Sequence, residues 1–264
     1  MRRLLTFSCA GAELGASLDV APGGTGLLLV TGGSQTRIGS HRMYERLAKA
    51  LAEQDISCFR FDRRGVGDSG SEDPGFRGAG PDIAAAAAAF RRAAPGLGRL
   101  YGLGLCDGAT ALALFGKAAG LDGVVLVNPW LVEAQADAPP PAAIRAHYRK
   151  RLLSREGWRK MLSGAVNWRK LLRGISRISA RRQGAPLARE TAAALRAGGS
   201  RAWLILAESD GTAVAAAQEL RAPAFKGLVE GREIVNSDSH TFARPGDEAA
   251  LLAAVARAVK ALAN

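Results

Sequence analysis

Apolar residues along the chain follow two patterns, short continuous runs and longer segments with helical spacing. The runs are bounded by glycine or charged residues, which is typical of strands that a sheet buries on both faces. The longer segments repeat apolar residues every three to four positions, which predicts amphipathic helices. Strands are predicted at residues 25–33, 56–62, 99–105 and 121–129, and a strand followed by a loop is predicted at residues 201–210 and again at 231–240. Helices are predicted at residues 40–54, 82–94, 107–119, 212–221 and 246–263.

The order of these segments predicts an α/β fold. Residues 4–11 and 13–21 alternate apolar and polar side chains, as an opening antiparallel pair of half-buried strands does. The following strands alternate with helices, which implies right-handed crossovers and a mostly parallel sheet with helices on both faces. Ser40 is expected to cap the first helix.

One segment interrupts the alternation. Residues 131–196 begin with a polar linker that contains prolines. They continue with tryptophan, leucine and isoleucine at near-helical spacing, which predicts two or three short helices. The chain therefore divides into a core of residues 1–130 and 197–264 and an insertion of residues 131–196, with no internal repeat.

The insertion carries the basic charge of the chain. Residues 142–184 hold 13 arginines and lysines against Glu156 alone, and the formal net charge of the chain is +12. No nucleic-acid recognition motif accompanies this charge, so we expect no nucleic-acid partner. Three interpretations remain open, namely a solvated helix surface, steering of an anionic substrate or acyl carrier, and peripheral contact with an anionic membrane. Nothing in the sequence indicates the oligomeric state.

Composition indicates the compartment and excludes several classes of site. No run of about 18 apolar residues predicts a membrane span, and the start of the chain lacks the long apolar core of a signal peptide, so we expect a cytoplasmic protein. Three cysteines at wide spacing argue against a disulfide framework and against a metal site. Cys9 and Cys58 lie inside strands and are interpreted as core residues. We expect neither a metal nor an organic cofactor.

Three residues with complementary chemistry follow separate strands. Cys106 follows residues 99–105 and opens a helix, Asp210 follows the next-to-last strand, and His240 follows the last. Ligands gather at the carboxyl ends of parallel strands, so these side chains are expected to meet. The order of nucleophile, acid and histidine is that of a triad in which His240 shares the thiol proton and Asp210 orients the ring. Glu208 is the rival acid.

The glycines around Cys106 predict a sharp turn. Gly104 and Gly108 flank the thiol, where a strand-to-helix turn brings backbones too close for side chains. The N–H of Asp107 is expected to be one donor to a reaction oxyanion. For the second donor we expect Gly33, with Ser34 as the alternative. Ser34, His41 and Trp130 are weaker candidates for lining the substrate pocket.

Several segments resemble the α/β-hydrolases. The stretch "FRFDRRGVGDSG" is similar to their Asp-x-Arg-Gly-x-Gly-x-Ser turn, while "LAESD" resembles their acid loop and "SDSHTF" their histidine loop. The resemblance implies the α/β-hydrolase fold, with the insertion as a helical cap over the active site. The positions that match the turn are Asp62, Arg64, Gly65, Gly67 and Ser69.

A narrower resemblance concerns the nucleophile. The stretches "GGSQTRIGSHRMYERLAKALA", "FRFDRRGVGDS" and "GLCDGATALAL" together resemble bacterial hydrolases associated with the exosortase A system, which accompany exopolysaccharide and protein-sorting loci. Dienelactone hydrolases are similar in having a cysteine nucleophile, which implies a working thiol at Cys106. Thr31, Gly32 and Gly33 stand where many α/β-hydrolases have His-Gly, so the identity of the second oxyanion donor is open.

These observations predict an acyl hydrolase, an esterase or thioesterase that works through an acyl-Cys106 intermediate on a small or carrier-bound acyl substrate. Two alternatives remain open. The thioester could pass its acyl group to a saccharide or amine, which would make the protein an acyltransferase. The fold could also serve as a non-enzymatic binding protein.

Overall fold

The computed structural model describes residues 2–133, 185–199 and 201–264. Eight strands form one sheet in the order β1-β2-β4-β3-β5-β6-β7-β8. Four strands come from the first part of the chain, β1 (Arg2–Cys9), β2 (Ala12–Asp19), β3 (Thr25–Val30) and β4 (Ile56–Phe61). The others are β5 (Arg99–Leu105), β6 (Gly123–Val127), β7 (Arg201–Ala207) and β8 (Gly231–Val235).

The sheet is parallel except at its first edge. β1 pairs with β2 and β2 with β4 in antiparallel register, whereas all later pairs are parallel. The central strands β4 and β6 are buried at every residue, which explains their continuous apolar runs. The predicted α/β class, with its opening antiparallel pair, is therefore confirmed.

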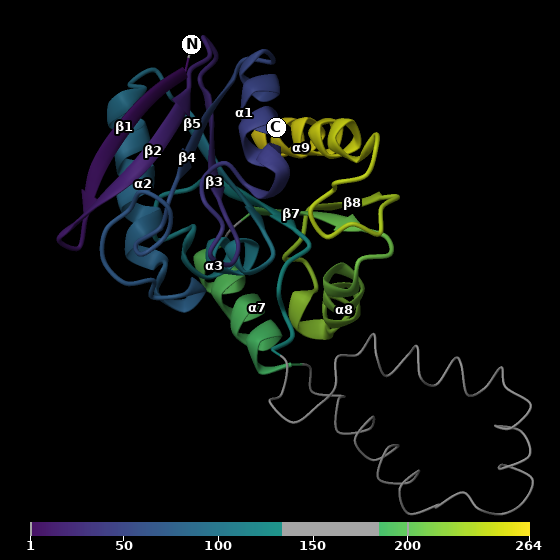
Figure 1. Cartoon of the computed structure of the whole chain (residues 1–264). Coiled ribbons are helices and arrows are strands. Elements are labelled where there is room, and N and C mark those ends of the chain that lie inside the picture. Colours follow the sequence, from purple (N-terminus) through teal and green to yellow (C-terminus); the bar gives the residue numbers. More distant parts are fainter. Residues whose placement is uncertain (1, 134–184, 200) are drawn as a thin grey trace, which may run out of the picture.

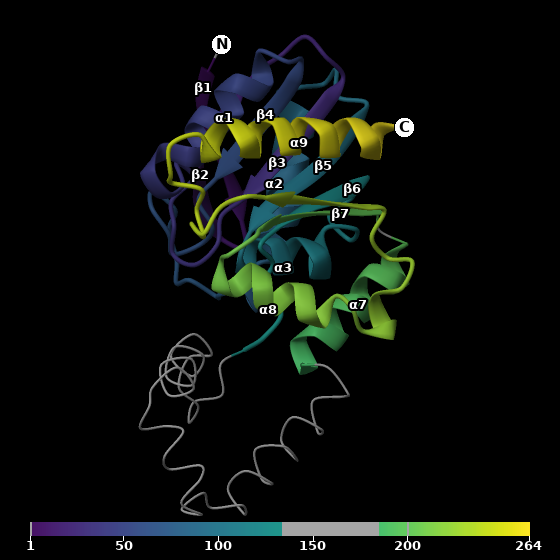
Figure 2. The same ribbon diagram turned by 90° about the vertical axis from the view of Figure 1, so that its right-hand side faces the viewer.

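Helices cover both faces of the sheet (Figures 1 and 2). On one face α1 (Met43–Ala52) and α9 (Asp247–Ala263) contact each other, and Leu47 and Val255 lie in one hydrophobic cluster. The other face holds α2 (Gly80–Ala93), α3 (Asp107–Phe115), α7 (Pro186–Gly198) and α8 (Gly211–Glu219).

Helix α7 lies at the end of the predicted insertion but packs with the core. The sequence places residues up to 196 in the cap, but α7 packs against α3 and buries Leu187, Thr191 and Leu195. Their spacing of four residues forms the apolar stripe of a core helix, and Pro186 at its start fits the first helical turn. Residues 134–184, which carry the rest of the expected cap and its basic charge, lie outside the described residues. The cap therefore stays a prediction.

Helix α1 begins later than expected. Ser40 is the first residue of a short 3-10 turn whose N-cap is Gly39, so Ser40 does not occupy the N-cap position of α1. The residue before α1 is Arg42, whose φ of 64° is left-handed. The preceding residue, His41, also has a positive φ of 42°. Two consecutive residues in this region turn the chain sharply, so the helix cannot start at Ser40.

The described residues also bear on two smaller expectations. Cys9 and Cys58 are buried free thiols, as expected of core residues. No helix among residues 2–133, 185–199 and 201–264 is long and apolar enough to cross a membrane.

Candidate active site

Cys106 lies on a strained turn between β5 and α3. Its φ of 60° and ψ of −126° fall outside the regions that non-glycine residues ordinarily occupy. Two hydrogen bonds fix this turn to the end of β6, because the Cys106 N–H donates to Val127 O at 3.0 Å and the Trp130 N–H donates to Cys106 O at 3.1 Å. Strain held by its surroundings is a mark of functional sites.

The glycines beside Cys106 are required by close backbone contacts. A methyl group on Gly104 would lie 2.6 Å from the backbone of Gly108 and Ala109. A methyl group on Gly108 would lie 2.6 Å from Val30 O, at the end of the neighbouring strand β3. Real methyl groups do not approach so closely, so a side chain at either position would push the strand and helix apart.

The structure brings His240 and Asp210 together. The His240 Nδ1 lies 3.0 Å from Asp210 Oδ2, and both residues follow the parallel strands at the end of the chain. The same oxygen accepts the Ala213 N–H at 2.9 Å, so Asp210 also caps α8. Glu208, the rival acid, is exposed, and its N–H extends the pairing with β8. The described geometry therefore favours Asp210 as the partner of His240.

The electrostatics of this pair favour an ion pair. Burial raises the pKa of Asp210, but the hydrogen bonds from His240 and Ala213 outweigh it and hold that pKa below its usual value. Asp210 first, and the side chain of Cys106 second, raise the pKa of His240 to about 10. The imidazolium form of His240 is thus stabilised between a carboxylate and a thiol. This is the charge state that can protonate a leaving group.

Asn128 joins three parts of the site, and sequence reasoning missed it. It is fully buried after β6 with a φ of 42°. Its Nδ2 donates to His240 O at 3.1 Å, and its Oδ1 accepts the Ala207 N–H at 2.8 Å. Its own N–H donates to Ile205 O. An asparagine directly after a buried strand is the signal that could have identified it, because asparagine tolerates left-handed backbone.

We expect Asn128→Ala to lower the free energy of unfolding by about 2–3 kcal/mol. The substitution leaves the buried Ala207 N–H without its acceptor, which costs about 1–3 kcal/mol, and alanine disfavours the positive φ. Urea denaturation measures the change. The control is Asn236→Ala at an exposed asparagine after β8, for which a change within about 0.5 kcal/mol is expected. Equal effects of the two substitutions would contradict the role given to Asn128.

The second expected oxyanion donor is not free. The Gly33 N–H donates to Asp107 Oδ1 at 2.7 Å. Sequence reasoning treated Asp107 only as a backbone donor, but its side chain folds back over the loop after β3 and takes this N–H. The N–H of Asp107 itself has no intrahelical acceptor, because Asp107 is the first residue of α3. Gly33 can serve an oxyanion only after the carboxylate has moved.

A buried arginine anchors the loop that contains Gly33. Arg63 is 1% exposed, and its Nη2 donates to Gly33 O at 2.5 Å. Asp62 holds the neighbouring segment, because its carboxylate accepts the N–H of Arg37 and of Asp68 and pairs with the Arg37 guanidinium. Arg64 pairs with buried Asp82 at 2.5 Å. The turn that resembles the Asp-x-Arg-Gly-x-Gly-x-Ser pattern therefore braces the loop beside Cys106.

The weaker pocket candidates lie around these groups. Ser34 is exposed in the turn after Gly33. Trp130 is half-buried, and its main chain contacts Cys106. His41 Nε2 lies 2.8 Å from Thr241 O, so this nitrogen donates, and His41 Nδ1 lies 3.2 Å from Arg46 Nη2. His41 thereby connects the start of α1 to the residue after His240.

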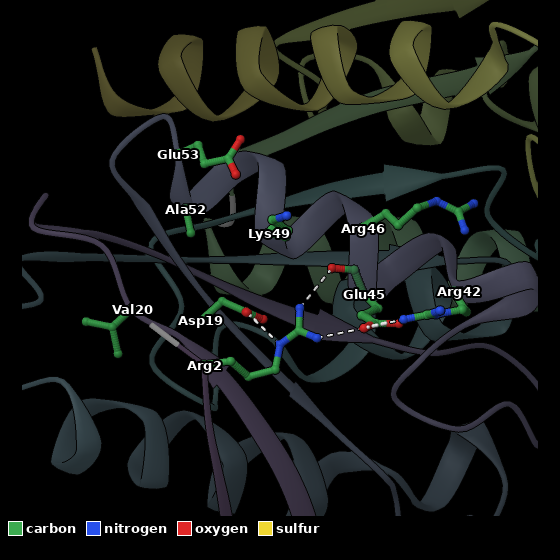
Figure 3. Close-up of a pocket in the computed structure, with 9 residues that line it drawn as sticks. All are labelled: Arg2, Asp19, Val20, Arg42, Glu45, Arg46, Lys49, Ala52 and Glu53. Carbon is green, nitrogen blue, oxygen red and sulfur yellow. Dashed lines mark hydrogen bonds and ion pairs between the residues drawn. The ribbon is translucent and has the colours of Figure 1, made fainter.

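A separate groove of about 650 Å³ lies along α1 and does not include the thiol (Figure 3). Its charged side chains largely neutralise one another, since Arg2 pairs with Asp19 and with Glu45, and Arg42 pairs with Glu45. We therefore place the candidate site at Cys106. Within the described residues no cluster of metal-binding side chains occurs. The groove is lined by Arg2, Asp19, Val20, Arg42, Glu45, Arg46, Lys49, Ala52 and Glu53.

Solved structures share this fold at low sequence identity. The α/β hydrolase GrgF from Penicillium sp. sh18 is 16% identical, with a TM-score of 0.66 and 98% of each chain covered. The Pyrococcus furiosus esterase Pf2001 is 13% identical, with a TM-score of 0.63 over 97% of this chain and 90% of that one. The dienelactone hydrolase from Anabaena variabilis ATCC 29413 is also 13% identical, with a TM-score of 0.63 over 97% and 95%.

Sequence comparison assigns the family. No curated protein matches the chain. Residues 36–225 match the family described as "Serine aminopeptidase, S33", which covers most of the chain and both strand ends that carry Cys106 and Asp210. The chain is therefore a hydrolytic enzyme with the α/β-hydrolase fold, and it belongs to the serine aminopeptidase S33 family.

Proposed function

We propose that the protein is an acyl hydrolase that cleaves ester or thioester bonds through a triad of Cys106, His240 and Asp210. The observation that carries the proposal is the strained Cys106 at the carboxyl end of β5, beside a histidine whose Nδ1 is held by a buried carboxylate. The family is described by its serine enzymes, and this chain has a thiol at the elbow. A thiolate is a stronger nucleophile than the hydroxyl of a serine, and a thiol needs less help from a base.

Acylation uses the ion pair of the resting site. The Cys106 sulfur attacks the substrate carbonyl carbon, and the carbonyl electron pair moves onto oxygen, which the Asp107 N–H stabilises. The oxyanion then collapses and the bond to the leaving group breaks. His240 gives its proton to the departing oxygen or sulfur, and Asp210 holds the ring in place.

Deacylation needs His240 in its neutral form. The Cys106 side chain is one of the groups that raise the pKa of His240, and an acylated sulfur carries no charge. The pKa of His240 therefore falls in the acyl-enzyme, and the ring becomes a better base at neutral pH. It takes a proton from water as the water oxygen attacks the thioester. The C–S bond of the thioester then breaks, the acid product leaves, and the Cys106 sulfur and the protonated His240 return to the state that began acylation.

The narrower expectations belong to this proposal. Membership of the exosortase A system-associated hydrolases is supported by the three quoted stretches around Gly33, Asp62 and Cys106. The proposal also includes a link to exopolysaccharide or protein-sorting loci and a cytoplasmic location. It further includes an anionic acyl substrate that the basic segment steers. Acyl transfer to a saccharide or amine uses the same intermediate and differs only in the acceptor.

Trapping the intermediate tests the proposal. We expect p-nitrophenyl acetate to release p-nitrophenol in a burst of about one equivalent, with one acetyl group on the protein by intact mass. Peptide mapping should place this group on Cys106 rather than on the buried Cys9 or Cys58. Adding glucose or a primary amine then separates hydrolysis from transfer, because only transfer yields an acetylated acceptor. A protein that releases no p-nitrophenol and takes up no acetyl group would contradict the proposal.

A further inference from the structure

The side chain of Asp107 lies where the carbonyl oxygen of a substrate would bind. Its Oδ1 accepts the Gly33 N–H at 2.7 Å, and this N–H is the second donor that an oxyanion would use. A methyl group on Gly32 would lie 2.7 Å from the same Oδ1 and 3.1 Å from Cys106 Cβ. The Asp107 carboxylate and the Cys106 side chain thus both lie next to Gly32.

The loop that carries Gly33 is anchored by its other groups, so Asp107 is the part that can move. The buried Arg63 holds Gly33 O, and the Gln35 N–H donates to Gly32 O at 3.4 Å. Rotation about the Cα–Cβ bond of Asp107 frees the Gly33 N–H without moving the backbone. Asp107 is half-buried, so its carboxylate has room to turn away from the loop.

Two negative groups compete for this donor during the reaction. The tetrahedral intermediate develops a full charge on the former carbonyl oxygen, next to the position that the carboxylate occupies. One N–H cannot serve both, and like charges at close range in a half-buried site repel each other strongly. A partner that draws the Asp107 carboxylate away from Gly33 and holds it therefore accelerates acyl transfer.

We propose that Asp107 is a specificity-determining residue that favours acyl groups with a hydroxyl, as a hydrogen-bond donor, on the carbon next to the carbonyl. This inference rests on the proposed acyl-Cys106 chemistry. The donor binds the carboxylate, and the Gly33 N–H becomes available to the oxyanion. The donor must lie on the acyl half of the substrate. The oxyanion forms once in acylation and again in deacylation, and the leaving group has gone before the second step.

Matched substrates and a charge deletion test this assignment. The p-nitrophenyl esters of 2-hydroxypropionate and 2-methylpropionate differ only by hydroxyl against methyl. We expect Asp107→Ala to reduce the ratio of their kcat/KM values by about 10- to 100-fold, the effect of losing one hydrogen bond to a charged group. The intrinsic reactivity of the two esters cancels when the ratios are compared. The 2-methylpropionate ester should react faster with Asp107→Ala than with the wild type, because the substitution frees the Gly33 N–H.

A second variant at Asp107 and a control at another carboxylate distinguish a specific effect from a general one. Asp107→Asn preserves an acceptor for Gly33 and removes the charge at the start of α3, and it should also lose the preference. Glu208→Gln removes an exposed carboxylate after β7 and should keep the wild-type ratio. If both Asp107 variants keep the wild-type ratio while hydrolysing both esters, the inference is wrong and the proposed function stands. If the wild type hydrolyses neither ester faster than Cys106→Ala, the proposed function fails and the inference with it.

Discussion

Replacing Cys106 by alanine should reduce kcat toward p-nitrophenyl acetate by about 10⁶-fold. Loss of the nucleophile in a hydrolase triad has an effect of this size, because the remaining groups cannot form the covalent intermediate. Intact mass should show no acetyl group on the variant. The measurement combines the p-nitrophenol burst with mass spectrometry on the same sample.

Two further variants make the Cys106 experiment specific. Cys58→Ala removes a fully buried thiol in β4 and should keep both the burst and the adduct. Cys106→Ser places a hydroxyl on the same strained turn, with its φ of 60°. We expect slow acylation in this variant, since a hydroxyl must give its proton to a neutral imidazole, whereas the resting site favours the imidazolium form of His240. Wild-type rates in Cys106→Ala would place the chemistry elsewhere.

Replacing Asp210 by asparagine should lower kcat by about 10⁴-fold while leaving the protein folded. The loss follows from the missing charge on His240 and from the wrong ring tautomer. Asparagine is as good a helix cap as aspartate, so the bond to the Ala213 N–H and the start of α8 are retained. Asp210→Ala should lose the cap as well, at a cost of about 1 kcal/mol. Steady-state kinetics and urea denaturation of both variants separate the two effects.

The same substitution should change how stability depends on pH. In the folded protein the pKa of His240 is raised from 6.5 to about 10. Between these values the folded state holds a proton that the unfolded chain has released, so stability falls as pH rises through this window. The contribution is fully present below pH 6.5. In Asp210→Asn the largest cause of the raised pKa is gone, and urea denaturation across the window should show a smaller alkaline loss. Identical pH profiles would contradict the coupling of His240 to Asp210.

Most of the fold could be predicted from the pattern of apolar runs. Buried parallel strands have no polar face, and their length and bounding glycines distinguish them from helices, as at β5 and β6. The predicted insertion, residues 131–196, includes most of α7, because the predicted alternation of strands and helices resumes only at residue 201. Its own stripe of Leu187, Thr191 and Leu195 carried the necessary signal.

The sequence could predict only those site residues whose position follows from the end of a strand. Chain order placed Cys106, Asp210 and His240 at one edge of the sheet, and the structure brings Asp210 and His240 into contact. The Asp107 carboxylate on Gly33 could not be foreseen, because it depends on one side-chain rotamer above a loop. The role of Asn128 depends on the position of the His240 main chain, which no local pattern encodes.

The hydrogen bond from His41 to Thr241 joins residues 200 positions apart. Asn128 makes a second long-range link to His240, across 112 positions. Contacts so distant in sequence form only after large loops have closed, which makes them slow and late in folding. On the ribosome, the N-terminal strands and α3 emerge well before β8 and the residues that follow it. A nascent chain therefore exposes its elbow thiol before its histidine is made, and the contacts of His240 with Asp210 and Asn128 form only when the C-terminal segment docks.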